Sequence, residues 1–267
     1  MQLSRVLAIL LRQYYLLRGS MARVFPLFAW GFINIVLWGF ITRYLNQITA
    51  TGGGLIPAFL GAVLLWEFLS RVMLGVTTAF FEDVWARNFL NIFATPLKIS
   101  EYILGLVLSS IFTSTVGLVV MLALATAAFG LSLLVYGAMI IPFVLILFLF
   151  GISLGIFGAA MVMRFGPASE WFVWPIPAII SPFACVFYPL ATLPHWMQSV
   201  SLALPPSYVF EGMRTIVAHG TVPVGDLLWG SALALAYIAA ACWCFTRVYR
   251  YAVRVGLIAR YSAESIS

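Results

Sequence analysis

Charged residues are scarce in this sequence. Only 8% of its 267 residues are Asp, Glu, Lys or Arg, whereas 64% are hydrophobic. Soluble domains carry about a quarter charged residues, so this composition predicts an integral membrane protein in contact with membrane lipids. The formal net charge of +6 comes from basic residues at the ends of apolar runs, where membrane topology places them. We therefore expect no nucleic-acid partner.

The sequence also lacks the residue patterns of several catalytic and metal sites. Its single lysine, Lys98, follows a Thr-Pro-Leu segment and not a glycine-rich loop, so we expect no nucleotide site and no ATP hydrolysis by the chain alone. His195 and His219 have no partners at zinc-ligand spacing. The three cysteines lie in apolar segments, where cysteine acts as a small hydrophobe. We expect no catalytic residue, no metal and no cofactor bound by this chain.

Six apolar segments are candidates to cross a hydrocarbon core of about 30 Å, at about 1.5 Å per helical residue. They are residues 24–45, 55–81, 96–129, 136–163, 171–191 and 227–248. The fifth contains four prolines, so we expect it to be kinked or broken. The prediction is an all-α integral membrane protein with six transmembrane helices, forming a single transmembrane domain over residues 1–267.

Small residues recur every four positions in two of these segments. They are Gly105, Ser109, Thr113 and Gly117 in the third span, and Gly151, Gly155 and Ala159 in the fourth. Such seams let helix backbones approach closely. We expect the third and fourth spans to pack against each other.

The segments outside the spans have distinct patterns. Residues 1–22 place Arg5 and Arg12 opposite an apolar stripe, which is typical of an interfacial helix and not of a secretory signal. Residues 192–224 contain two apolar pieces too short to span, separated by Pro205 and Pro206, with Ser207 as an expected N-cap. They predict an extracytoplasmic re-entrant helical hairpin, and residues 249–267 form a basic tail.

Basic residues predict the orientation of the spans. If six segments cross the membrane, both ends lie on one side together with most of the positive charge. The residues on that side are Arg5, Arg12, Arg18, Arg23, Arg87, Lys98, Arg164, Arg247, Arg250, Arg254 and Arg260, whereas Arg43 and Arg214 fall on the other. Cytoplasmic loops are enriched in Lys and Arg, so we expect both termini and residues 82–95 to be cytoplasmic.

Residues 82–95, EDVWARNFLNIFAT, form a polar segment between two apolar spans. Its apolar side chains lie on one face of a helix and its polar ones on the other. The apolar face contains Trp85, Phe89, Ile92 and Phe93, and the polar face contains Asp83, Arg87 and Asn91. We expect a short cytoplasmic helix with an Asp83–Arg87 pair, followed by Thr95 and Pro96 as the start of the next helix. The alternative is an ordinary membrane-surface loop.

Glu67 and Arg71 lie one helical turn apart within the second span. A charge there costs about 2.5 to 3.5 kcal/mol on the insertion scale, so both side chains must face protein or water. Two interpretations stay open: the pair lines a translocation path, or it locks one helix to another. Asn34 in the first span is expected to form an interhelical hydrogen bond.

Aromatic residues near these charges are further candidates for the path. Trp66 precedes Glu67, while Trp171 and Trp174 lie at the start of the fifth span. Such side chains favour an amphiphilic, lipid-linked or hydrophobic substrate, although aromatic residues also form ordinary membrane belts.

The order of these segments resembles the membrane (permease) subunit of a type-2 ABC (ATP-binding cassette) exporter. The stretch with Asn88, Phe93, Thr95, Pro96 and residues 101–105 (EYILG) is similar to the family's segment between the second and third spans. Residues 204–208 (LPPSY), followed by Glu211 and Arg214, are similar to its segment before the last span.

This resemblance implies a coupling helix that inserts into a groove on a separate ATP-binding subunit. The coupling residues would be Glu82, Asp83, Trp85, Arg87, Asn88, Phe89 and Asn91. It also implies a homodimer of this chain with two ATP-binding cassette subunits, which would carry ATP and Mg, in the bacterial cytoplasmic (inner) membrane. Two copies would enclose a path that opens alternately to each side.

The function expected from these patterns is that of an exporter permease for a glycoconjugate, lipid or drug. A secondary transporter or channel without an ATPase partner is the alternative, and it calls for inverted repeats with paired broken helices. An intramembrane enzyme would need a convergent set of nucleophile, base or metal ligands, which the sequence does not provide.

Overall fold

The computed structural model describes residues 2–49, 56–86, 88, 91–92 and 94–257, without the side chains of residues 22–24, 26–28, 49, 56 and 57. Within these ranges the chain is helical and contains no strand. The long helices are α1 (Leu3–Arg18), α2 (Met21–Thr49), α3 (Gly61–Trp85), α5 (Ile99–Phe129), α6 (Ile140–Phe165) and α11 (Val224–Val255). The short helices are η1 (Ile56–Leu60), η2 (Leu133–Met139), η3 (Pro167–Ser169), α7 (Glu170–Val173), α8 (Ile176–Ile180), η4 (Leu190–Thr192), α9 (His195–Ser201) and α10 (Pro205–His219).

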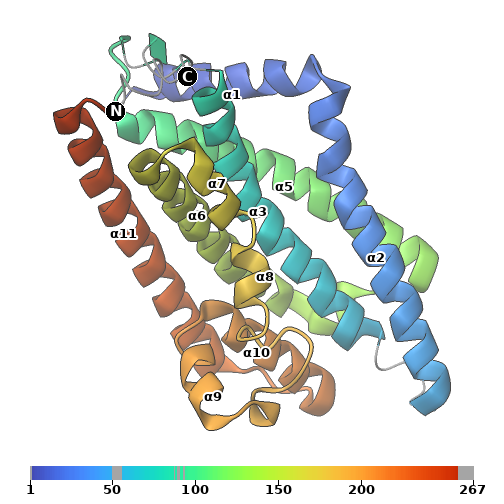
Figure 1. The fold of residues 1–267 in the computed structure, drawn as a ribbon. Coiled ribbons are helices and arrows are strands. Elements are labelled where there is room, and N and C mark those ends of the chain that lie inside the picture. Colours follow the sequence, from blue (N-terminus) through green and yellow to red (C-terminus); the bar gives the residue numbers. More distant parts are fainter. Residues whose placement is uncertain (1, 50–55, 87, 89–90, 93, 258–267) are drawn as a thin grey trace.

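The central helix of the bundle is α3. Most of its residues are buried, because α5 packs along one side of it and α6 along another, while α11 covers the far side of α6 (Figure 1). Gly155 of α6 sits so close to α3 that an added Cβ would lie 2.7 Å from the Cβ of Val76. On the other side, Ser110 of α5 donates a hydrogen bond to the carbonyl of Val72 (2.8 Å).

The expected packing of the third span against the fourth is therefore wrong. Gly151 and Gly155 face α3, and Gly117 of α5 faces Arg71 of α3. Both small-residue seams allow a close approach, but not to each other: Gly151, Gly155 and Gly117 approach α3, whereas Gly105 approaches α1. The four-residue period of small residues indicates that a helix packs closely against a neighbour, but it does not indicate which neighbour.

Four helices among the described residues are long and apolar enough to cross a membrane. They cover Ala58–Trp85, Ile99–Phe129, Leu133–Phe165 and Val224–Val255, which correspond to the second, third, fourth and sixth predicted spans. The predicted first span lies within α2, whose 29 residues reach about 44 Å at 1.5 Å per residue. The fifth is broken as expected, into α7, α8 and a series of turns, so a count of six continuous spans is not what the structure shows.

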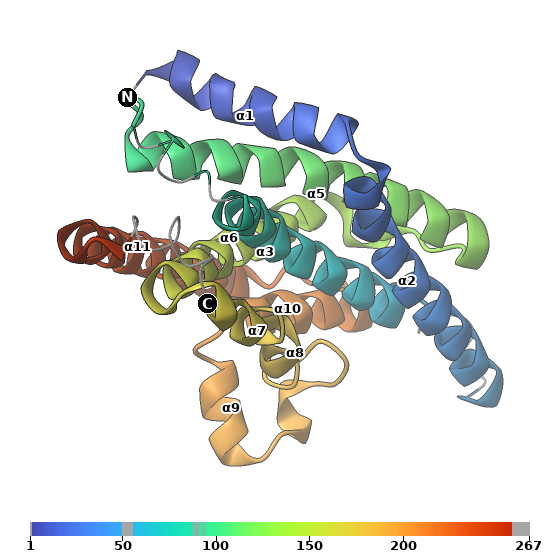
Figure 2. The same cartoon turned by 45° about the horizontal axis from the view of Figure 1, so that its top comes forward.

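The predicted N-terminal helix is present as α1, which runs across one end of the bundle beside the first half of α5 (Figures 1 and 2). Its buried face includes Val6 and Ile9. A Cβ added to Gly105 of α5 would lie 2.6 Å from Ile9. The end of α3 and the last turns of α11 lie at this same end of the molecule (Figure 1), as the charge distribution predicts.

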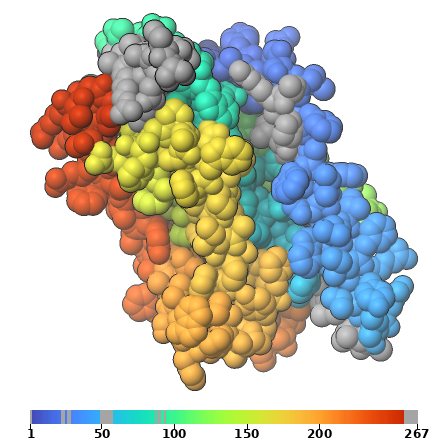
Figure 3. Space-filling model, viewed as in Figure 1, coloured from blue at the N-terminus to red at the C-terminus, as the bar shows by residue number. Residues whose placement is uncertain are grey.

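The opposite end carries a cap made of α9 and α10, reached through the segment that contains α7 and α8 (Figure 3). The two short helices of the predicted hairpin are therefore present. α10 starts at Pro205, and its N-cap is Leu204. Ser207 is not the N-cap that we expected, because its hydroxyl donates instead to the carbonyl of Phe183 (3.2 Å) and ties the cap to the preceding segment.

Candidate coupling site

Asp83, in the last turn of α3, joins three helices. One of its carboxylate oxygens pairs with the guanidinium of Arg12 in α1, and the other accepts a hydrogen bond from the hydroxyl of Tyr102 in α5 (2.7 Å). Asp83 and Tyr102 are fully buried. A buried carboxylate is tolerated only with such partners, so the position of α1 is linked to the end of α3.

A second polar contact holds the start of α1 against the start of α5. The carboxylate of Glu101 accepts hydrogen bonds from the backbone N–H of Gln2 (2.7 Å) and from that of Lys98 (3.0 Å). Arg5 lies 3.5 Å from the same carboxylate. The bond from Lys98 satisfies a donor that the first turn of a helix leaves unpaired. The first residues of α1 are thus fixed to α5, and Arg12, two turns further along α1, is fixed to α3.

Trp85 connects the end of α3 with the broken segment. Its indole N–H donates a hydrogen bond to the carboxylate of Glu170 (2.9 Å), and its ring packs at a tilt against Phe81, with 6.0 Å between centroids. Glu170 is the first residue of α7. The last turn of α3 therefore contacts α1, α5 and α7 through two neighbouring side chains.

The predicted helix over residues 82–95 is not a single helix. Glu82, Asp83 and Trp85 belong to α3, which ends at Trp85. α3 extends this far because Phe81, Asp83 and Val84 in its last turns are buried against the bundle. Thr95 and Pro96 do not start the next helix, since α5 begins at Ile99 with Lys98 as N-cap.

A short helical turn follows α3. The backbone N–H of Asn88 donates to the carbonyl of Asp83 (3.1 Å), and that of Ile92 donates to the carbonyl of Asn88 (3.0 Å). The side-chain amide of Asn91 donates to that of Asn88 (3.1 Å), and Ile92 is buried. Arg87, Phe89 and Phe93, which also belong to the predicted helix, lie outside the described residues.

The predicted place of Asp83 on an exposed polar face is also wrong. Helical spacing suggested Arg87 as its partner, but Asp83 pairs with Arg12, 71 residues earlier, and with Tyr102, 19 residues later. No local spacing predicts contacts over such separations. The sequence signal nearest to this contact is that Arg12 lies in the middle of α1 among mostly apolar residues.

The sequence profile of ABC-2 type transporters matches residues 5–218, which is most of the chain. The chain belongs to the ABC-2 type transporter family. The match runs from α1 to α10 and includes the contacts around Asp83. A comparison with curated proteins gives no match. Family membership makes this chain a multi-pass membrane protein and implies an ATP-binding partner.

Inside the bundle of this ABC-2 chain, Glu67 and Arg71 connect α3 to its neighbours. The side-chain amide of Asn34 in α2 donates a hydrogen bond to the carboxylate of Glu67 (2.7 Å), which confirms the interhelical role of Asn34. Arg71 lies in a slot between two glycines: an added Cβ would be 2.7 Å from its Nη2 at Gly31 of α2 and 2.8 Å from its Nε at Gly117 of α5. These contacts favour the interpretation of the pair as a connection between helices.

The structure does not gather the tryptophans that we proposed for a path. Trp66 is buried and packs against Phe210 of α10, with 6.3 Å between ring centroids. Trp171 and Trp174 lie in and just after α7, where their side chains are 76% and 42% exposed. A shared lining role for these three residues is not supported within one copy of the ABC-2 chain.

At the opposite end, Glu211 and Arg214 of α10 hold the segment that follows α8. Arg214 donates hydrogen bonds to the carboxylate of Glu211 (2.9 Å) and to the carbonyl of Cys185 (2.5 Å). Glu211 also accepts one from the backbone N–H of Leu190 (2.6 Å). Cys185 has a φ of 55°, a strained value for a residue with a side chain. The pair therefore stabilises an unusual turn and links the cap to the broken segment.

Proposed function

We propose that this ABC-2 chain is the permease subunit of an ATP-driven exporter, and that its ATP-binding partner docks at the last turn of α3 and at residues 88–95. The observation that carries the proposal is the position of α3. It runs through the buried centre of the bundle, and its last turn is fixed to α1, α5 and α7 by Asp83 and Trp85.

This arrangement suits the transmission of force. A packed helix moves as a unit because interiors are close-packed and resist compression. A displacement of the turn after Trp85 would therefore shift α3 against α6, whose glycines lie directly on it. It would also shift α7, which begins the broken segment leading to the cap. Both ends of the molecule would then respond to one movement.

Family membership and the charge distribution support the rest of the proposed assembly. We propose two ATP-binding cassette subunits, which bind ATP and Mg, and a second copy of this chain that completes the path by two-fold symmetry. The concentration of arginines at the end with α1 supports a cytoplasmic position for that end. This orientation is that of a protein in the bacterial inner membrane with both termini inside.

For the substrate, we propose an amphiphilic, lipid-linked or hydrophobic molecule that leaves the cytoplasm by alternating access. The bundle offers apolar and aromatic surface in support of this class. Trp38 of α2 stacks on Phe187, with 4.9 Å between centroids, and Phe59 of η1 packs beside both rings. The charged pair inside the bundle, Glu67 and Arg71, contacts other helices.

Site-specific photocrosslinking tests the docking position. p-Benzoylphenylalanine is placed at exposed Asn91, which follows α3, or at exposed Tyr44, in the last two turns of α2. The ATP-binding subunit encoded or expressed with the chain is expected to crosslink at position 91 and not at position 44. Crosslinking at position 44 alone would place the partner at the wrong end of the bundle and refute the proposal.

A further inference from the structure

The surface of α11 that points away from the bundle has an ordered pattern. Buried residues of α11, such as Ala234, Ala241 and Phe245, face the bundle. The opposite side, which we call the outer face, carries the exposed residues Trp229, Ala232, Ala236, Ala239 and Trp243. It continues one turn later with the exposed arginines Arg247, Arg250 and Arg254. These eight positions recur every three or four residues and so lie in one line along the helix.

This order matches the layers of a bilayer. Tryptophan is enriched where a membrane meets water, and Trp243 lies at the boundary between the apolar and the basic part of this face. Trp229 lies about 21 Å away along the axis at 1.5 Å per residue, which is less than the full hydrocarbon core of about 30 Å. Small apolar side chains lie between them. Arg247 follows Trp243 by one turn, at the depth where lipid headgroups begin. The order of residues along the outer face is thus that of a helix that meets acyl chains along its apolar part and headgroups at its basic end.

Two of the arginines at this end lie against aromatic rings. The guanidinium carbon of Arg247 is 5.3 Å from the ring centroid of Trp243, and that of Arg164 in α6 is 4.0 Å from the ring centroid of Tyr251. Cation–π contacts of this kind orient the guanidinium groups. Among the described residues, no ion pair joins Arg164, Arg247, Arg250 or Arg254 to a carboxylate, so their positive charge is available to an anion.

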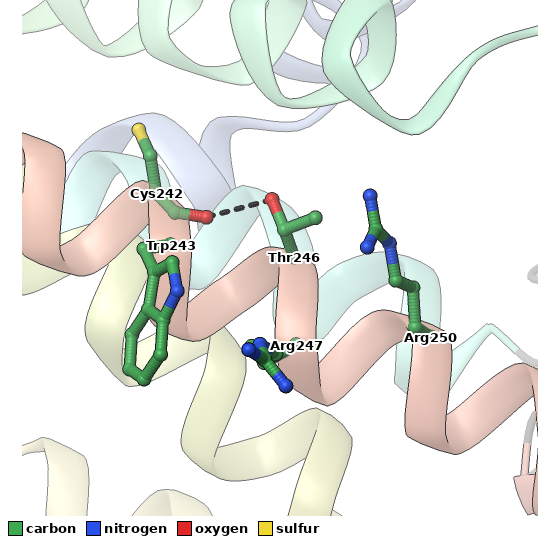
Figure 4. Close-up of a pocket in the computed structure, with 5 residues that line it drawn as sticks. All are labelled: Cys242, Trp243, Thr246, Arg247 and Arg250. Carbon is green, nitrogen blue, oxygen red and sulfur yellow. Dashed lines mark hydrogen bonds between the residues drawn. The ribbon is translucent and has the colours of Figure 1, made fainter.

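A recess accompanies this charge (Figure 4). It is lined by Cys242, Trp243, Thr246, Arg247 and Arg250, and the figure shows Arg247 beside Trp243 with Arg250 about one turn further along α11. The recess thus has an apolar end toward the middle of the helix and a basic end toward its last turns. That polarity is the polarity of a phospholipid.

We propose that the basic end of α11, formed by Trp243, Arg247, Arg250 and Arg254 with Arg164, binds the headgroup of an anionic phospholipid in the adjacent leaflet. Guanidinium groups match phosphate oxygens with paired hydrogen bonds. The acyl chains would lie along the apolar part of the outer face. Basic pockets beside membrane helices bind anionic headgroups by the same chemistry. The bound lipid would hold α11, and α6 behind it, at a fixed depth.

Lipid titration of the purified chain tests this. The protein is delipidated in a neutral detergent, and binding of phosphatidylglycerol or phosphatidylcholine is followed by native mass spectrometry and by the shift in melting temperature. Two triple variants are compared, R247Q/R250Q/R254Q and the charge-preserving R247K/R250K/R254K. The single variant R250Q is compared with R43Q, which removes one exposed arginine from α2 and serves as the matched control.

Each arginine lost from the basic end is expected to weaken phosphatidylglycerol binding by about fivefold, because one basic residue at an anionic surface contributes about 1 kcal/mol. Phosphatidylcholine binding should not change, and R43Q should bind like the wild type. The lysine variant keeps the charge but lacks the planar guanidinium groups, so it should bind phosphatidylglycerol more tightly than the glutamine variant and less tightly than the wild type. Equal phosphatidylglycerol binding by the glutamine triple variant and the wild type would overturn the proposal. So would an equal melting shift with inorganic phosphate, since that indicates a site for a soluble anion.

Discussion

Asp83 shows how one residue can position several helices. Its two carboxylate oxygens have different partners, Arg12 from α1 and Tyr102 from α5. Because Asp83 is fully buried, water cannot replace a lost partner. Asp83, which the sequence pattern predicts on an exposed helical face, therefore holds together the end of the molecule that we propose to be cytoplasmic.

Replacing Asp83 with Asn is expected to destabilise the protein by leaving Arg12 without its charge partner. Breaking a buried pair costs about 3 to 5 kcal/mol, and the 28% exposure of the Arg12 side chain reduces this to the lower end. The double variant R12M/D83N should recover much of the loss. Thermal unfolding in detergent measures this double-mutant cycle, with Arg18→Met on the same helix as control. Additive effects of R12M and D83N would show that the pair is not coupled.

Glu67 and Arg71 form a second case at this scale. In Glu67→Gln an oxygen acceptor for Asn34 remains, but the negative charge beside Arg71 is lost. The melting temperature is expected to fall, and E67Q/R71M should restore it, because Met fits the slot between Gly31 and Gly117 without a charge. If the pair only connects helices, transport assayed in liposomes survives in the double variant. A stable double variant that no longer transports would assign the pair to the path.

At the scale of elements, the contact between α3 and α6 depends on glycine. An added Cβ at Gly155 would lie 2.7 Å from Val76 and 2.9 Å from the carbonyl oxygen of Met73. Neither group can move without shifting α3. Gly225, in the first turn of α11, has open space around the position of an added Cβ. These two positions separate the effect of packing from the effect of helix propensity.

Gly155→Ala is expected to lower stability by about 1 to 3 kcal/mol, because overpacking forces the helices apart. Gly225→Ala should raise it by about 0.5 to 1 kcal/mol, because Ala favours a helix over Gly. Opposite shifts in the melting temperature of the two variants would support the close contact. A stabilising effect at both positions would show that α6 does not lie directly on α3.

At the scale of the whole molecule, the sequence predicts the helices better than their contacts. Apolar runs predict α3, α5, α6 and α11, because crossing a bilayer requires about 20 apolar residues, and four prolines predict the broken segment. Pairings between elements depend on residues far apart in the chain. The contacts of Asp83 and the bond between Trp85 and Glu170, 85 residues apart, left no periodic signal, and the small-residue seams did not identify their partner.

The central claim is that the last turn of α3 couples an ATP-binding partner to the bundle. The most direct measurement is substrate transported per ATP hydrolysed, in liposomes containing the chain and its ATP-binding subunit. Trp85→Ala removes an aromatic anchor and the bond to Glu170, while Trp229→Ala, 65% exposed near the start of α11, is the matched control. We expect Trp85→Ala either to release the ATP-binding subunit or to retain it and hydrolyse ATP without transport. Trp229→Ala should behave as the wild type. Normal assembly and normal coupling in Trp85→Ala would contradict the account.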